Sequence, residues 1–127
     1  MTFENTYNEW FLQSDYDLGT AEDMFRSGRY IYCIFMCHLS LEKVLKGLLI
    51  KKTGEFPIKT HSLVYFSEKI GISANEKQYE FLYTLDKISV PTRYPESLSK
   101  LIAVFTKEKT EDILNTTKEV QQWIKQQ

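Results

Sequence analysis

The sequence is poor in side chains that bind metals, with two cysteines and two histidines among 127 residues. Cys33 and Cys37 are four residues apart in a helical pattern, and in principle they could share a metal with His38 or His61. Structural zinc sites take four ligands at tighter, loop-borne spacings, whereas free cysteine is among the most buried residue types. We therefore expect no metal and two reduced thiols in the core. The sequence also lacks a glycine-rich phosphate loop, so we expect no cofactor.

The chain also lacks a charge bias and a long apolar run. Sixteen Lys and Arg against seventeen Asp and Glu leave a formal net charge of -1, so no global field gathers nucleic acid or anionic membrane. The mainly apolar run from Ile31 to Leu41 is too short to span a bilayer, and Met1 to Tyr7 lacks the basic flank and apolar core of a signal peptide. We expect a cytoplasmic protein without membrane contact, in which a local patch holds any polyanion.

The main positive signal in the sequence is the helical periodicity of its apolar residues. Hydrophobic residues make up 43% of the chain and aromatic residues 14%, which is enough for one packed core in a chain too short for two. We expect a single domain spanning residues 1–127. Apolar residues recur at steps of three and four along nearly the whole chain, and no segment is convincing as a strand. The pattern predicts an all-α fold, an antiparallel four- to five-helix up-and-down bundle.

Capping residues, glycines and prolines predict where the helices begin and end. The predicted helices run from the first turn near Tyr7 to Ser27–Gly28, from Tyr30 to Lys52, from Thr60 or Ser62 to Gly71, from a capping box over Ser73–Glu76 to Pro91, and onward from Thr106. Because Pro91 ends a helix and Pro95 disfavours a helical residue before it, we expect a loop from Val90 to Leu98 that carries Arg93.

The predicted helix from Tyr30 to Lys52 has two apolar stripes instead of one. A helix that is apolar around so much of its circumference is packed on several sides. We therefore expect it at the centre of the bundle, and part of it could face a partner subunit. Gly47 costs about 1 kcal/mol relative to alanine inside a helix, so close approach of another helix is a plausible reason for this residue.

An ordered set of short motifs resembles a known family. The set is Ser27-Gly28-Arg29-Tyr30, then Glu42-Lys43-x-Leu45-Lys46-x-Leu48-Leu49, then Pro57-x-x-Thr60-His61-Ser62-Leu63, then Arg93-Tyr94-Pro95. From about Trp10 to Trp123, the chain resembles the HEPN family of small helical domains. The resemblance implies a four- or five-helix bundle that commonly dimerises. It also implies a minimal nucleotidyltransferase as partner, in a toxin–antitoxin pair or a nucleotide-handling assembly.

The chain departs from this family's nuclease signature. Many HEPN proteins are metal-independent ribonucleases in which an arginine is followed, after four to six residues, by a histidine. None of the three arginines here, Arg26, Arg29 and Arg93, has a histidine at that spacing. Cleavage of RNA by its own 2′-hydroxyl needs a general base or acid, which histidine usually supplies. We therefore interpret Arg93 as a binder of phosphate or carboxylate through its planar fork.

The candidate ligand-binding residues are Arg93, Tyr94, Glu42, Lys43 and Lys46. Glu42 and Lys46 have the spacing of a helical ion pair, which could be only a solvated salt bridge. On the functional hypothesis, Glu42 orients Arg93 while Lys43 or Lys46 meets a phosphate, which requires the Arg93 loop to fold over the helix. Tyr94, beside this cation, could stack on a base.

The two histidines have ordinary structural explanations. A lone histidine on an apolar face, such as His38, is more often a hydrogen-bonded core residue. His61 is expected to cap the short helix or to bond to the loop before it. Either could replace the missing catalytic histidine only if the fold brings it to Arg93.

Two classes of function remain open on sequence grounds, beside a plain helical scaffold. The favoured one is a non-catalytic HEPN-type binding and dimerisation module that acts with a nucleotidyltransferase and contacts nucleotide or RNA through Arg93 and the Glu42 helix. The alternative is a metal-independent ribonuclease toxin with a rearranged site, in which Arg93 acts with His38 or His61. On this basis we lean against an enzyme.

Overall fold

The computed structural model describes residues 3–127, with side chains from Thr6 onward. Met1 and Thr2 lie outside the described residues. The expectation that Met1 to Tyr7 form no signal peptide therefore falls partly outside the described chain. The described chain is helical, without strands, in agreement with the predicted fold class. Its six helices are α1 (Phe3–Arg26), α2 (Tyr30–Thr53), α3 (Leu63–Ile70), α4 (Glu76–Arg93), α5 (Leu98–Val104) and α6 (Lys107–Lys125).

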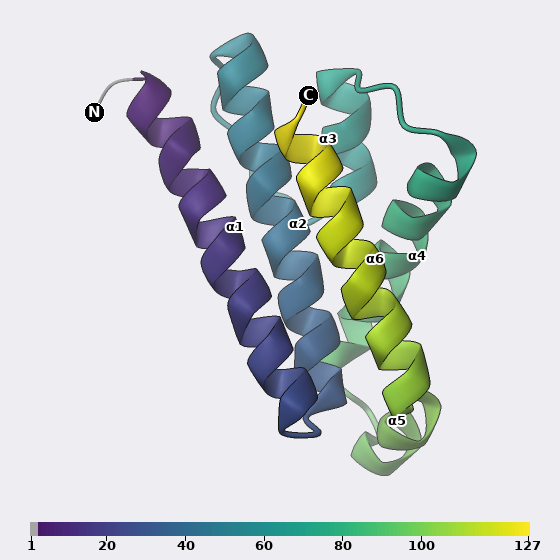
Figure 1. The fold of residues 1–127 in the computed structure, drawn as a ribbon. Coiled ribbons are helices and arrows are strands. Elements are labelled where there is room, and N and C mark those ends of the chain that lie inside the picture. The colour runs from purple at the N-terminus through teal and green to yellow at the C-terminus, as the bar shows by residue number, and fades with distance from the viewer. Residues whose placement is uncertain (1–2) are drawn as a thin grey trace.

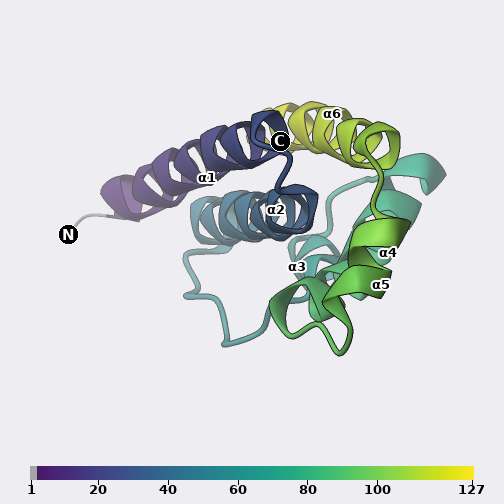
Figure 2. The ribbon, with the colours of Figure 1, turned by 90° about the horizontal axis from the view of Figure 1, so that it is seen from below.

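The four long helices form an up-and-down bundle, in which α1 and α4 run one way and α2 and α6 the other (Figure 1). Helix α2 lies at the centre, as predicted, and contacts each of the other helices. Figure 2 shows α1 and α6 on one side of α2, with α3, α4 and α5 on the other. No helix within residues 3–127 has both the length and the apolar content needed to cross a membrane.

Glycine shapes both the start of α2 and its packing. Gly28 has a φ of 79°, and the Gly28 and Arg29 amides donate to the carbonyls of Phe25 and Met24. This is a Schellman motif, which turns the chain sharply between α1 and α2. Gly47 allows α1 to approach closely, as predicted, since a Cβ there would lie 2.7 Å from the Phe11 ring.

The core follows α2 along its whole length. Leu41, Leu45 and Leu48 are fully buried there and pack with buried apolar residues of α3, α4 and α6. Cys33 and Cys37 are free and fully buried in a second cluster between α1, α2 and α6. The predicted core position of both cysteines is therefore confirmed.

The predicted start and end of the helix after residue 70 were both wrong. The capping box of α4 pairs Asn75 with Gln78, not Ser73 with Glu76. Helix α4 continues through Pro91 to Arg93, because a proline in the last turn removes only one backbone donor. Tyr94, which precedes Pro95, is the first residue with non-helical dihedrals. Arg93 therefore ends a helix instead of lying on a loop.

Helix α5 had no counterpart in the prediction. It begins after Ser97, whose hydroxyl caps it by accepting from the Lys100 amide. Within the described chain, it is a helix of seven residues with none buried. So short a helix has too few periodic apolar positions to be recognised, although the serine cap is a signal that could have been used.

Candidate functional site

A cavity of about 380 Å³ lies where α2, the segment before α3 and the end of α4 meet. Hollows of similar size lie between α4 and α6 and beside α5, but neither is lined by histidine or arginine. The first cavity brings together both histidines, Arg93 and Tyr94 from three separate parts of the sequence. Its lining is His38, Thr60, His61, Ser62, Asp86, Ser89, Val90, Arg93 and Tyr94.

Arg93 enters this cavity without an anionic partner among the described residues. Its guanidinium carbon lies 4.5 Å from the centroid of the Phe35 ring, so the group stacks on α2. Its Nη2 atom is buried and has no hydrogen-bond partner among the described residues. Buried polar groups are normally paired, and a cation withdrawn from water without a counter-charge is costly. An anion in the cavity would supply the counter-charge that the guanidinium lacks.

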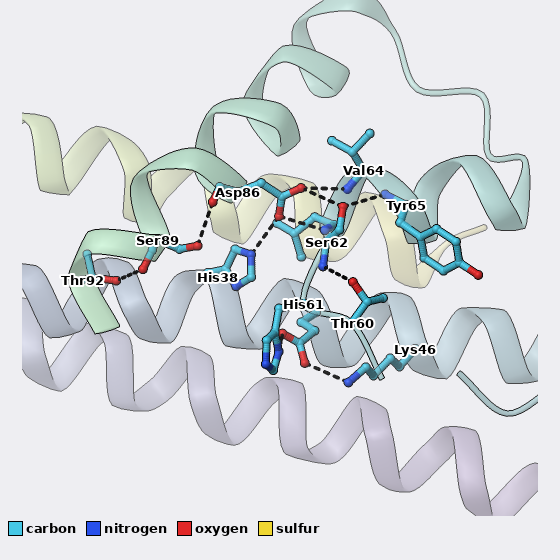
Figure 3. A network of polar contacts seen from close by, with 12 residues as sticks. His38, Lys46, Thr60, His61, Ser62, Val64, Tyr65, Asp86, Ser89 and Thr92 are labelled. Carbon is cyan, nitrogen blue, oxygen red and sulfur yellow. Dashed lines mark hydrogen bonds and ion pairs between the residues drawn. The ribbon is translucent and has the colours of Figure 1, made fainter. Parts of the chain in front are cut away.

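Asp86 of α4 lines the cavity and hydrogen-bonds to α2 and to the start of α3 (Figure 3). Its Oδ1 atom accepts from His38 Nε2 and from the Leu63 amide, both at 2.9 Å. Its Oδ2 atom accepts from the Val64 amide at 3.1 Å and from the Ser62 hydroxyl at 3.3 Å. Two of these donors are amides of the first turn of α3, so Asp86 caps that helix from a neighbouring one.

These bonds affect the acidity of Asp86. Burial by itself would raise the pKa of its carboxyl, but the hydrogen bonds from His38 and from the Leu63 and Val64 amides outweigh burial. The pKa of Asp86 is therefore lowered, and the ionised form is favoured. A charged Asp86 holds the Thr60–Ser62 segment against α4.

Glu42 of α2 is only 3% exposed and does not itself line the cavity. Its Oε2 atom lies 2.8 Å from Lys46 Nζ, and its Oε1 atom lies 2.9 Å from His61 Nδ1. The Glu42–Lys46 pair is therefore not a solvated salt bridge, and the carboxylate contacts His61 instead of orienting Arg93. The predicted role of His61 was also wrong, because Ser62 caps α3 and the His61 ring bonds to Glu42.

The two lysines of the sequence hypothesis do not line the cavity. Lys43 pairs with Asp17 of α1 at 2.8 Å. Lys46 is held by Glu42, and its ammonium lies 5.5 Å from the Trp10 ring centroid and 5.8 Å from that of Phe66. Both cations are thus already paired with carboxylates. Of these three predicted cations, Arg93 is the one that lines the cavity.

The two histidines differ in exposure. His38 is 1% exposed and bonds Asp86 through Nε2, whereas the side chain of His61 is 68% exposed. Within the described chain, neither histidine hydrogen-bonds to Arg93. Tyr94, 84% exposed, stands at the rim.

Sequence reasoning missed Asp86. It lies four residues after Leu82 and three before Ser89, both of which are buried on the inner face of α4. An acidic residue in an apolar helical stripe is unusual, because aspartate is almost never buried unless it is paired. That position was the available signal. Within residues 6–127, whose side chains are described, no three His, Cys, Asp or Glu side chains gather as a metal site would need.

Comparison with known proteins identifies the fold. A family model described as the HEPN domain matches residues 7–127. The crystal structure of TT1696 from Thermus thermophilus superposes with a TM-score of 0.84 at 22% identity, covering 96% of this chain and 98% of that one. The crystal structure of ST0689, an archaeal HEPN homologue, gives a TM-score of 0.73 at 23% identity, with 94% of each chain covered. No curated protein matches the sequence.

Proposed function

The chain belongs to the HEPN domain family, and we propose that it is a binding module that holds a phosphate of a nucleotide or RNA against Arg93. The observation that carries this proposal is the arginine itself, a partly buried cation with no anionic partner among the described residues, facing a cavity. A guanidinium fork matches the oxygens of a phosphate in geometry and charge.

The rest of the cavity suits such a ligand. Its volume of about 380 Å³ is within the range of small-molecule sites. Thr60 offers a hydroxyl whose oxygen accepts from the Ser62 amide and whose proton can still be donated, and the exposed ring of Tyr94 can stack on a base. The first amides of α3 are already bonded to Asp86, so the phosphate contacts come from side chains and not from a helix N-terminus.

The proposal includes a homodimer and a nucleotidyltransferase partner, in a toxin–antitoxin or nucleotide-handling pair in the cytoplasm. Family membership supports these parts. Exposed apolar side chains support an interface between two copies, because Leu98, Ile102 and Val104 of α5 are each at least half exposed. A surface of this kind is typical of a protein interface.

The test is equilibrium binding of adenosine monophosphate and of a short fluorescein-labelled single-stranded RNA. Arg93→Met keeps an aliphatic stem over Phe35 but removes the cation, and we expect affinity to fall about tenfold or more, since hydrogen bonds to charged groups contribute about 1.5–3 kcal/mol. The slope of log affinity for RNA against log salt concentration should also become shallower by about one. Arg26→Met, at an exposed arginine that pairs with Asp23, is the matched control. Equal affinity in both variants would refute the role of Arg93.

A second candidate is a metal-independent ribonuclease toxin that uses Arg93 with His38 or His61. The observation in its favour is that all three side chains line one cavity. The purified protein would be incubated with labelled total cellular RNA in chelator, beside Arg93→Met. Cleavage that disappears in the variant would make the chain an enzyme. Intact RNA in both samples would leave the binding module as the better account.

A further inference from the structure

We infer that His61 is the second group that contacts the ligand, and that Glu42 is a buried positioning residue that fixes the tautomer of its ring. The ligand contact rests on the proposed function, whereas the tautomer follows from the geometry of the chain alone. The contact that carries the inference is the 2.9 Å separation between Glu42 Oε1 and His61 Nδ1.

The first step is the direction of this hydrogen bond. An ionised carboxylate can only accept, so Nδ1 of His61 must carry the proton. The tautomer of a neutral imidazole is set by the hydrogen bond that one of its nitrogens makes. Nε2, on the opposite edge of the ring, is then left with a free lone pair when the ring is neutral. Because His61 lines the cavity and its side chain is 68% exposed, Nε2 is the nitrogen open to a ligand.

The second step is that Glu42 is an immobile anchor. It lies in the middle of α2 at 3% exposure, and its other oxygen is held by Lys46 at 2.8 Å. Lys46 already supplies the counter-charge that a buried carboxylate needs. An exposed imidazole does not need a buried partner for its own solvation. Burial of a second Glu42 oxygen against His61 is therefore better explained by orientation of the ring than by stability.

The third step separates the two histidines. His38 is buried and its Nε2 atom is bonded to Asp86, so that ring holds the wall of the cavity instead of meeting a ligand. The expected neutral tautomers are therefore opposite, with the proton on Nδ1 in His61 and on Nε2 in His38. A ligand held between Arg93 and the neutral His61 ring must offer an acceptor oxygen to the guanidinium and a hydroxyl donor to Nε2, as a nucleoside monophosphate does through its phosphate and its ribose hydroxyls.

Nuclear magnetic resonance can observe the tautomers directly, because the chain has two histidines. Long-range proton–nitrogen correlation spectra of ¹⁵N-histidine-labelled protein, recorded where the rings are neutral, should show His61 as the Nδ1–H form and His38 as the Nε2–H form. His61 in the Nε2–H form in the wild type would overturn the role of Glu42. This measurement needs no ligand and no variant.

Glu42→Gln should reverse the His61 tautomer. The Lys46 ammonium can only donate, so it should hold the new amide oxygen and turn the amide nitrogen towards His61 Nδ1. That ring nitrogen must then accept, and the ring proton moves to Nε2. His38 serves as an internal reference, and Glu22→Gln, which changes an ion pair with Lys118 on the surface, should leave both rings unchanged. An unchanged His61 tautomer in Glu42→Gln would contradict the inference.

Binding of adenosine monophosphate tests the ligand contact. We expect Glu42→Gln, which turns the Nε2 acceptor into a donor, and His61→Gln each to weaken binding about two- to tenfold, the effect of losing one neutral hydrogen bond, and Glu22→Gln to bind as the wild type. His61→Gln replaces an exposed side chain, so it remains informative even if Glu42→Gln does not fold. Wild-type affinity in His61→Gln would refute the contact. Failure of Arg93→Met to weaken binding would instead refute the proposed function, whichever tautomer the spectra show.

Discussion

Asp86 is the residue whose replacement most directly tests how the cavity is built. Four donors converge on its carboxylate, from His38, Ser62, Leu63 and Val64. In Asp86→Asn, the single amide oxygen can still serve the His38 and Leu63 donors, but the new amide nitrogen faces the Val64 amide, which is itself a donor. The variant therefore leaves one backbone donor of α3 unpaired and removes the charge that strengthened the others.

The expected loss follows from these contacts. An unpaired buried donor costs about 1–3 kcal/mol, and loss of a helix cap costs about 0.5–2 kcal/mol. We expect Asp86→Asn to lower the free energy of unfolding by about 2–4 kcal/mol, a large share of the roughly 5–15 kcal/mol typical of a domain. Urea denaturation followed by far-ultraviolet circular dichroism measures this loss. Asp112→Asn, at an exposed aspartate of α6, is the control and should change stability by less than about 0.5 kcal/mol.

The loss of stability at acidic pH should also depend on Asp86. The pKa of Asp86 is lowered in the folded protein because hydrogen bonds from His38 and the two α3 amides outweigh the effect of burial. Its contribution to stability is therefore complete above the unfolded-chain pKa of about 3.9 and is lost as the pH falls through the lower folded value. Asp86→Asn should lose this part of the acid dependence. A wild-type acid profile in the variant, or a loss below about 0.5 kcal/mol at neutral pH, would refute the network as described.

Three further predictions concern packing and capping. Gly47→Ala gains about 1 kcal/mol of helix propensity, but its Cβ would lie 2.7 Å from the Phe11 ring, so we expect net destabilisation by up to about 2 kcal/mol. A rise in the urea midpoint would show that α1 and α2 are not so close. Ser62→Ala removes the acceptor for the Tyr65 amide and should cost about 1 kcal/mol of unfolding free energy, whereas an unchanged melting curve would count against Ser62 as the cap. Cys33 and Cys37 should stay unreactive towards Ellman's reagent until the chain unfolds, because both are fully buried and the pKa of Cys37 is raised by its hydrogen bond to Cys33 and by burial. Rapid labelling of the native protein would contradict this packing.

The helices could be predicted because their signals are local. The central helix was expected from Tyr30 to Lys52 and runs from Tyr30 to Thr53, while the last helix begins after Thr106 as expected. Periodicity, caps and left-handed glycines each act within a few residues along the chain. The errors at Pro91 and at α5 are also local, since a proline in the last helical turn and a seven-residue helix both lie at the limit of such signals.

The candidate site could be predicted only in part. Arg93, Tyr94 and both histidines were singled out from the sequence, and the cavity brings them together. The roles expected for Glu42, Lys43 and Lys46 required knowledge of which side chains they meet. Spacing within α2 suggested the Glu42–Lys46 pair, but it contained no information on burial or on the distant His61.

The amino-acid sequence by itself determined the helical class, the central position of α2 and the family, because periodicity and motif order are properties of the chain. Dimerisation, the nucleotidyltransferase partner and contact with nucleotide or RNA stay predictions. Only the tertiary structure decided that Asp86 caps α3, that Glu42 is buried against His61 and that Arg93 has no anionic partner among the described residues. The contacts of Asp86 with the start of α3 and of Glu42 with His61 join groups 19 or more residues apart, so they exist only after the helices have packed with particular faces together.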